Sequence, residues 1–417
     1  MNKSGIKWGM FTARFPLLHM RIEWRELIQG LVVSLSSGLA LVPLLTTAFG
    51  LTFDEAITIS MIHIMLNTSS VVIFGEPYAS GWIAPAFPFA LAFVLSGADS
   101  PTERFQLMTA LTLDFTVIVL FLGITGLGAT MVRRIPNALK AGIILGAALS
   151  AFKRVFYDDI ESFIAMPTAM TLALVSTLVI AFYGPFQEWR KKNKIAGFIA
   201  SFGLLPSFIL AGVFGSLLGE FVFDIQMGFL IPPIGDMFDK VSPFAIGFPS
   251  LEFFIEALPL AFISYLLLFG DLLTGVALIE GAQKHRPDDP IEFNLSRSHY
   301  SIAIRNALSA VIAPFFPTQG ILWAGGQVII LERWKQGKEA IENLFSGISA
   351  FYYYGIPVAV MFLPVVTFLK PFMPIALMLA LTMTAVACSK LAFQIALSKN
   401  DRFIMALTAV VLTYFWG

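Results

Sequence analysis

Apolar runs separated by short polar breaks cover almost the whole chain. We interpret thirteen of them as membrane spans, at 27–49, 55–74, 82–96, 105–130, 137–153, 162–185, 196–218, 251–279, 300–314, 324–333, 345–368, 374–390 and 402–416. Because a bilayer core of ~30 Å takes about 20 apolar residues per helix, the pattern predicts an all-α polytopic membrane protein. Two runs, 82–96 and 324–333, are too short to cross alone, and each follows an extended segment that contains glycine and proline.

The second short run lies in the stretch FFPTQGILWAGGQVIILERW, residues 315–334. We predict that Pro317 ends the preceding helix and that residues 318–323 cross as an extended strand. The glycines that follow would leave the N-terminus of a half-helix exposed. Inside a membrane, irregular backbone is tolerated only where it is buried in protein or lines a cavity. A bare helix N-terminus offers unpaired N–H groups and partial positive charge, which favour an anion or a polar acceptor.

The first short run lies in YASGWIAPAFPF, residues 78–89, and repeats this design. Gly81 aligns with Gly320 at an offset of 239 residues, and Pro136 aligns with Pro374 at an offset of 238. An odd number of spans separates the two copies, so they run in opposite directions through the bilayer. The pattern therefore predicts the inverted repeat of many secondary transporters, in which broken helices meet near the midplane.

Composition and charge give an orientation and exclude several classes of function. Of the 417 residues, 57% are hydrophobic and 13% are charged, and the net charge is zero, which argues against a nucleic-acid partner. The N-terminal segment 1–26 is amphipathic and basic, so the positive-inside rule places it in the cytoplasm, through Lys3, Lys7, Arg14, Arg21 and Arg25. The single cysteine allows no intrachain disulfide, and the four histidines show no metal-binding spacing. Without a phosphate-binding loop or a metalloprotease motif, we expect neither a cofactor nor an enzyme.

Four stretches resemble the superfamily that contains the nucleobase (xanthine/uracil) permeases and the sulfate/bicarbonate-type anion permeases. They are GLALVPLL (38–45), EPYASGWIAPAF (76–87), LPLAFISYLLLFGDLL (258–273) and RNALSAVIAPFFPTQGILWAGGQ (305–327). The resemblance implies two inverted repeats of about seven spans, with a core domain (27–131 and 251–368) and a gate domain (132–250 and 369–417). It also implies elevator-like alternating access and a homodimer formed through the gate domain.

The chain departs from this family pattern in two ways. Its last residue, Gly417, comes just after the thirteenth span, so we expect a fourteenth span to be absent or replaced. The two carboxylates with which nucleobase permeases hold the base would fall on Leu267 and Gly326, whose side chains cannot hydrogen-bond a base. These losses favour an anion over a nucleobase, although Gln327 and backbone groups would still suit a base.

The predicted substrate-binding residues surround the two half-helices and two neighbouring spans. They are Ser37, Gly81, Trp82, Ala84, Phe87, Tyr265, Trp323, Ala324, Gly325, Gly326 and Gln327. Ser34, Ser36 and Ser37 of the first span are equally suited to packing between membrane helices. The two tryptophans either line the substrate site or anchor the protein at the membrane interface.

Carboxylates deep in apolar spans are the candidates for ion coupling, because an ionised group there is costly and usually functional. Asp271 would carry a proton, or bind Na⁺ together with Thr274 and backbone carbonyls, and its alternative role is a helix–helix contact. Asp114 is either a proton relay and partner of Asp271 or a structural hydrogen-bonding group. No other metal is expected.

The remaining polar residues favour structural roles. We expect Arg305 to lie near the cytoplasmic edge and extend to the headgroups, with substrate steering as the alternative. Glu252 and Glu256 are predicted to be interfacial, and Glu76 to line a mouth or cap a segment. His63 is predicted to be a hydrogen-bonded core residue, and His285 and His299 to lie in a polar loop.

Together these features predict a secondary-active transporter in the cell membrane. It would move a small anion or polar solute by elevator-like alternating access, coupled to H⁺ or Na⁺. The alternatives are a nucleobase:proton symporter of the xanthine/uracil type and, from another class, an anion channel with a continuous polar pore. A scaffold or enzyme is disfavoured, because broken helices would serve no purpose without a ligand.

Overall fold

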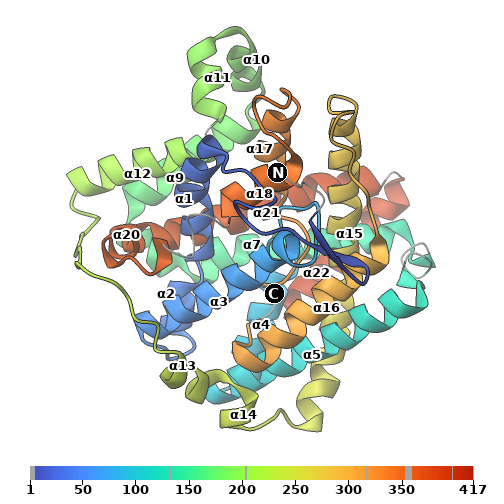
Figure 1. Ribbon diagram of the computed structural model, residues 1–417. Helices are drawn as coiled ribbons and strands as arrows, with labels where there is room; N and C mark the ends of the chain where they lie inside the picture. Colours follow the sequence, from blue (N-terminus) through green and yellow to red (C-terminus); the bar gives the residue numbers. More distant parts are fainter. Residues whose placement is uncertain are drawn as a thin grey trace.

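The chain folds almost entirely into apolar helices, as the alternation of long apolar runs and short polar breaks predicts (Figure 1). The structure is a computed structural model that describes residues 5–128, 130, 134–201, 204–315, 318–352, 359–396 and 398–416. Pro317, predicted to end a helix, lies outside the described residues.

The first half of the chain supplies a β-hairpin and a series of helices. These are β1 (Ile6–Trp8), β2 (Phe11–Ala13), α1 (Trp24–Gly38), α2 (Val42–Thr47), α3 (Phe53–Val72), α4 (Phe87–Gly97), α5 (Pro101–Thr125), α7 (Asn137–Lys153), the π-helical turn η1 (Arg154–Asp158), α8 (Ile160–Ala165), α9 (Pro167–Phe182), α10 (Gly184–Lys192), α11 (Lys194–Ser201) and α12 (Leu205–Leu217).

The second half follows a long connection over residues 218–233. Its elements are α13 (Ile234–Val241), α14 (Pro243–Ile246), α15 (Leu251–Gln283), α16 (Leu295–Ile312), α17 (Ala324–Trp334), α18 (Leu344–Tyr352), α20 (Leu363–Leu369), the 3₁₀ turn η2 (Lys370–Phe372), α21 (Met373–Ile395) and α22 (Lys399–Trp416).

Local sequence signals set several helix starts. Thr52 and Glu55 form a reciprocal capping box at the start of α3, and Ser100 and Glu103 form another at the start of α5. Such a pair satisfies two backbone N–H groups that have no partner within the helix. At the other end of α5, Gly126 adopts the left-handed conformation with φ of 66°, which glycine adopts without steric cost and which often ends a helix.

Several predicted spans are divided rather than continuous. Four helical stretches among the described residues are long and apolar enough to cross a membrane alone, Phe53–Val72, Pro101–Thr125, Leu251–Gln283 and Leu363–Ile395. The pair α9 and α10, bent by 66°, would make a fifth. The predicted span 27–49 breaks into α1 and α2 just before Pro43, because proline cannot donate to the preceding turn.

The predicted start of the ninth span at residue 300 is wrong by about one turn. The helix α16 begins at Leu295, where the Asn294 side chain accepts a hydrogen bond of 2.9 Å from the Arg297 N–H. The polar residues of its first turns are typical of a loop in the sequence. In the structure, Arg297, Ser298 and His299 are buried against other parts of the protein.

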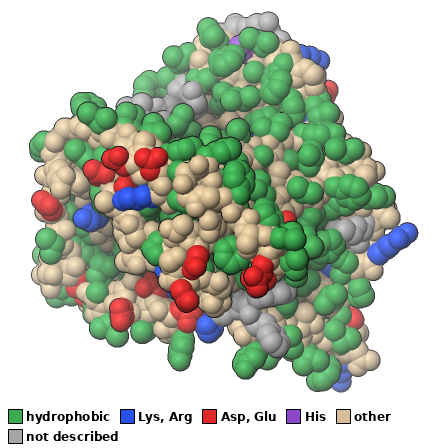
Figure 2. Space-filling model, turned by 90° about the horizontal axis from the view of Figure 1, so that it is seen from below, with side chains coloured by type: hydrophobic (Ala, Val, Ile, Leu, Met, Phe, Trp, Pro, Cys, Tyr) green, Lys and Arg blue, Asp and Glu red, His purple; other side chains and the backbone are tan. Residues whose placement is uncertain are grey.

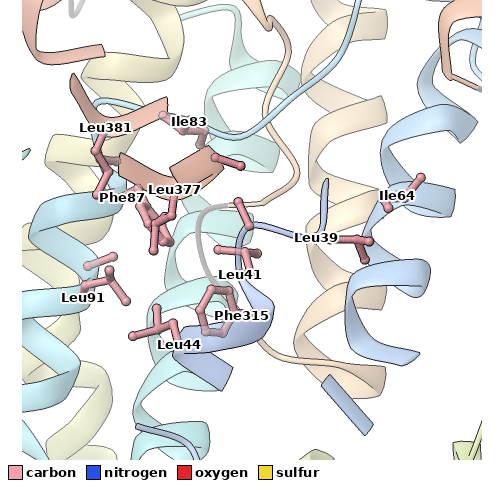
Figure 3. Packing of buried hydrophobic residues seen from close by; sticks show 14 of the residues in the cluster. Leu39, Leu41, Leu44, Ile64, Ile83, Phe87, Leu91, Phe315, Leu377 and Leu381 are labelled. Atoms are coloured by element: carbon pink, nitrogen blue, oxygen red, sulfur yellow. The ribbon is translucent and has the colours of Figure 1, made fainter. Parts of the chain in front are cut away.

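Two sets of helices pack most closely together. In the first set, α5 lies along α15 and α16; in the second, α7 lies along α21 and α22, and α9 lies along α12. Figure 3 shows the second set against the first broken span: Leu377 and Leu381 of α21 lie beside Ile83 and Phe87. Large apolar side chains thus fill the space between α21 and this span.

The N-terminal hairpin is a small β structure that the sequence pattern did not indicate. The indole N–H of Trp8 donates to the Ile73 carbonyl at 2.9 Å, and the Arg14 backbone N–H donates to the Val72 carbonyl at 2.7 Å. Further along, the Arg333 guanidinium pairs with the buried Glu26 carboxylate at 2.9 Å. The N-terminal segment is therefore bound to the ends of α3 and α17.

One end of the molecule is acidic. Figure 2 looks onto the end that carries α13 and α14 in Figure 1, where most of the charged side chains in view are acidic. Exposed Asp236 and Asp239 of α13 belong to this region.

A carboxylate from a loop caps α9. Glu220 accepts hydrogen bonds from the N–H groups of Thr168 and Ala169 at 2.9 and 2.8 Å. Partial burial acts to raise the pKa of Glu220, but these backbone hydrogen bonds outweigh it and hold the pKa below its usual value.

We expect Glu220→Ala to lower the free energy of unfolding by about 1 kcal/mol, a typical cost of losing a helix cap. Since the pKa is depressed in the folded protein, the contribution is present above the unfolded pKa and is lost as the pH falls through the folded pKa. Thermal unfolding in detergent at several pH values measures this, with the exposed Glu256→Ala as control. A deficit that is the same at every pH would contradict the assignment.

Candidate functional site

The two predicted extended segments meet and cross. Trp323 donates its backbone N–H to the Ala79 carbonyl at 2.6 Å, and the Ser80 hydroxyl donates to the Gly320 carbonyl at 2.8 Å. Ala79 thus lies beside Trp323 and Ser80 beside Gly320, so the segments run in opposite directions. They are extended, as predicted, but they do not form a regular β-ladder.

Glycine is required at the crossing point. A Cβ atom on Gly320 would lie 2.5 Å from the Gly81 carbonyl oxygen, and one on Gly81 would lie 2.7 Å from the Trp323 Cβ. Real Cβ atoms do not approach other atoms so closely, so any larger residue would push the segments apart. The two glycines that reveal the repeat in the sequence are therefore the residues that let its copies touch.

The guanidinium of Arg305 holds both segments. It is fully buried in α16 and donates to the Ser80 hydroxyl at 3.1 Å and to the Gly320 carbonyl at 3.0 Å. The prediction that Arg305 extends to the headgroups is wrong, because α16 begins earlier than the apolar pattern indicates and this places Arg305 in the helix interior. Sequence reasoning missed its role because only the fold brings Ser80 and Gly320 to it.

A second buried charge network lies close by. The Glu76 carboxylate is fully buried, pairs with Arg297 at 2.9 Å and accepts from the Ser298 hydroxyl at 2.6 Å. Glu76 therefore joins the start of the first extended segment to the first turn of α16. The Glu76 carboxylate faces protein rather than a mouth, and its partners are two side chains of α16 rather than the free N–H groups that a cap binds.

Further polar side chains satisfy the backbone of the second segment. Asn67 donates to the Thr318 carbonyl at 2.8 Å, and Asn306 donates to the Gln319 carbonyl at 2.9 Å. His63 is buried, and its Nδ1 lies 2.7 Å from the Thr318 hydroxyl, so its predicted place in a hydrogen-bonded core is confirmed. The irregular backbone is thus buried in protein, as its position in a membrane requires.

The second half-helix has hydrogen-bond donors without an acceptor in the part of the chain that the structure describes. The first N–H with a helical partner is that of Gln327, which donates to the Trp323 carbonyl at 2.9 Å, and Ala324 and Gly325 before it are exposed. Gln327 is buried, its Oε1 accepts from the Ala79 N–H at 2.5 Å, and its Nε2 has no partner among the described residues. The N-terminus of α17 therefore presents donors for which no described residue supplies an acceptor.

The first half-helix offers fewer donors. The N–H groups of Ala86 and Phe87 donate to the carbonyls of Ile83 and Ala84 in a preceding turn, at 2.9 and 3.3 Å, and Pro88 has no N–H. The half-exposed Ala84 lies within this turn. The two half-helices are thus similar in outline but unequal as anion sites.

Aromatic residues cover both half-helices. The rings of Trp82 and Phe87 lie 5.3 Å apart, and Phe87 is buried against Phe315 at 6.3 Å. On the other half-helix, the Trp323 ring lies against Gly326. Both tryptophans are half-buried beside the half-helices, and their role in lining the site stays a prediction.

Tyr265 and Ser37 have less distinctive surroundings. The Tyr265 hydroxyl lies 3.0 Å from His299 Nε2, while His299 Nδ1 faces the Leu295 carbonyl at 2.7 Å. The prediction that His299 lies in a polar loop is wrong, since it is buried in α16. Ser37 is half-buried on α1, and the placement of the Ser36 side chain lies outside the described part of the chain.

The candidate coupling residues do not form one cluster. Asp271 is half-buried on α15, and the structure records no hydrogen bond or ion pair for it with any described residue. The Thr274 hydroxyl is exposed and donates to the Gly270 carbonyl at 2.8 Å. Asp114 is half-buried on α5, and its Oδ2 has no partner among the described residues. No group of three or more His, Cys, Asp or Glu side chains suited to a metal ion occurs in the described ranges.

Glu252, Glu256 and His285 lie at the two ends of α15, away from its apolar centre. Glu252 and Glu256 are exposed in the first turns of α15, in agreement with an interfacial position. His285 is exposed in the turn after α15, as predicted.

No protein-family profile matches the sequence, and no curated protein matches it. Among solved structures, the chain is similar to the transmembrane domain of the cyanobacterial bicarbonate transporter BicA. The match covers 95% of this chain and 97% of that one, with a TM-score of 0.51 and 14% sequence identity. This chain has the fold of that transmembrane domain.

The similarity confirms the predicted fold class, an all-α multi-pass membrane protein. The fold also agrees with the one that the resemblance of the four sequence stretches implies.

The buried Glu76–Arg297 pair gives a test of the site's framework. Removing one partner of a buried ion pair leaves an unpaired charge and typically costs about 3–5 kcal/mol. We therefore expect Glu76→Gln and Arg297→Met each to lower the unfolding temperature strongly, and the double variant to be more stable than either single variant. Thermal unfolding of the four proteins in detergent measures this. Strictly additive losses in the double variant would show that the pair does not act as a unit.

Proposed function

We propose that the protein is a secondary-active transporter of a small anion, which binds at the N-terminus of α17. The observation that carries the proposal is a set of donors without an acceptor among the described residues: the N–H groups before Gln327, and the buried Gln327 Nε2. An anion satisfies such donors, and a helix N-terminus favours negative charge.

The buried charges next to the crossing also favour an anion. Arg305 contacts neutral acceptors, and Glu76, the carboxylate that acts on it electrostatically, is already paired with Arg297. The Glu76 network therefore leaves one positive charge uncompensated behind the crossing. In a low-dielectric interior this charge attracts an anion in front of it.

A nucleobase suits this site less well. A base presents donors as well as acceptors, and neither Leu267 nor Gly326 can accept a hydrogen bond through its side chain. A site of donors alone would leave the N–H groups of a base unpaired, which is costly when they are buried.

We further propose that transport is elevator-like and coupled through Asp271. The core domain (27–131 and 251–368) would contain the crossing and move against the gate domain (132–250 and 369–417), across the apolar contact of Leu377 and Leu381 with Phe87 (Figure 3). When Asp271 carries a proton, or a Na⁺ lies beside it, the core gains positive charge and binds the anion more tightly. Because such coupling is reciprocal, the anion also favours the cation.

We also propose a location, an orientation and an oligomeric state for the protein. The basic N-terminal segment would face the cytoplasm, in a cell membrane, and two copies would associate through the gate domain. An anion channel is the competing function, and it predicts flux that no proton or sodium gradient can drive uphill.

The anion site predicts a specific effect of bulk at Gly325. A Cβ there would meet only the Trp323 ring at ordinary contact distance, so Gly325→Val should fold, but its side chain would cover the free N–H groups. We expect affinity for small anions, measured by thermal shift with formate, bicarbonate and nitrate, to fall at least about tenfold. The matched control is Gly281→Val, at an exposed glycine of α15 with open space around it. Equal anion affinity in both variants would exclude this helix N-terminus as the site.

The coupling role predicts a specific effect of Asp271→Asn. Asparagine keeps the shape of the side chain but cannot bind a proton or supply a full charge to Na⁺. In proteoliposomes we expect uptake against a concentration gradient to stop, while exchange of anion down its gradient continues. Glu256→Gln on the same helix is the control. If uphill uptake and its dependence on pH or Na⁺ are unchanged in Asp271→Asn, the coupling residue lies elsewhere.

A further inference from the structure

We propose that Trp323 sets the size limit of the anion site, so that the protein accepts anions of the size of formate, nitrate or bicarbonate and rejects larger carboxylates. This inference rests on the proposed function. It concerns one side chain that lies on the half-helix where the donors are free.

The indole of Trp323 occupies the space that a side chain at position 326 would need. A Cβ on Gly326 would lie 2.5 Å from Trp323 Cε3 and 2.9 Å from Cζ3. The ring therefore folds back over the first turn of its own half-helix. The missing side chain at Gly326 is thus not an empty space open to a large substrate, because aromatic carbon fills it.

The ring is held in this position from two sides. Its centroid lies 5.8 Å from the Phe351 ring and 5.8 Å from the Tyr352 ring, both at the end of α18. Phe351 is itself buried, with its backbone against Gly30 of α1. On the side of the crossing, the Trp323 Cβ lies against Gly81. Turning the indole away would require these neighbours to move, so the ring acts as a fixed wall.

The polar edge of the indole faces the free end of the half-helix. Trp323 Nε1 lies 3.5 Å from the place of a Cβ on Gly325, which is exposed. An indole N–H is a donor only, so this edge adds to the donors of the helix N-terminus. The Tyr352 ring lies edge-on to the indole, and its buried hydroxyl has no partner among the described residues. A small anion can meet the indole N–H and the backbone N–H groups without displacing the ring.

The first half-helix has no equivalent arrangement. There Trp82 packs on Phe87, a large side chain, and the N–H groups are used by the preceding turn. The size limit is therefore imposed from the α17 side alone, and one substitution should remove it.

The experiment compares anions of increasing size on Trp323 variants. Binding of formate, nitrate, butyrate and benzoate to purified protein is measured by thermal shift, and each anion is then tested as a competitor of formate uptake in proteoliposomes. In Trp323→Ala we expect the affinity ratio of benzoate to formate to rise at least about tenfold, because the wall is removed. Trp323→Phe should shift the ratio less. Trp24→Ala, at an exposed tryptophan of α1, is the control and should leave the ratio unchanged.

The outcomes separate the inference from the function on which it rests. If wild-type protein binds none of the anions, the proposed function fails. If wild type binds formate and nitrate, and both Trp323→Ala and Trp323→Phe keep its preference for small anions, the size limit lies elsewhere and the inference is wrong. Should Trp323→Ala not fold, Trp323→Leu and Trp323→Phe provide a graded series, and an unchanged ratio across that series overturns the inference equally.

Discussion

The crossing of two extended segments inside an apolar bundle depends on the guanidinium of Arg305. Backbone without helical hydrogen bonds is costly in a membrane, since no water is present to satisfy it. Arg305 meets this requirement by binding Ser80 of one segment and Gly320 of the other. Its planar array of five donors suits this task better than a single ammonium group would. The positions of both half-helices follow from the crossing, because each begins within a few residues of these contacts.

The same arrangement explains why the two repeats are not equivalent. Both present a half-helix beyond a glycine, but Pro88 and the turn before it remove the donors of α4, whereas α17 keeps its own. An inverted repeat fixes the path of the backbone and leaves each copy free to differ in side chains. In this chain one copy provides apolar packing, through Phe87, and the other provides hydrogen bonds. In the substrate site that we propose, the hydrogen-bond donors accordingly come from α17 and not from α4.

The sequence predicted the features that depend on the backbone alone. Apolar runs gave the helices, and the spacing of Gly81 and Gly320 gave the crossing, since only glycine fits where two backbones touch. It could not predict contacts between distant side chains. Arg297 and Arg305 resemble interfacial charges in a linear reading, and their burial depends on Glu76 and Ser80, more than 200 residues away. The N-terminal hairpin was missed for a similar reason, because its binding groups are the backbone carbonyls of Val72 and Ile73.

Gly326 shows most clearly that the effect of one residue depends on the side chains packed around it. By the resemblance to nucleobase permeases, Gly326 stands at a position where those permeases have a carboxylate, and this chain lacks it. In the structure, the absent side chain leaves room for the Trp323 indole, which takes up the space and turns an N–H towards the half-helix. An acceptor has thus been exchanged for a donor at the point where the backbone already offers donors. The anion preference that we propose and the closure of the space therefore depend on the same pair of residues.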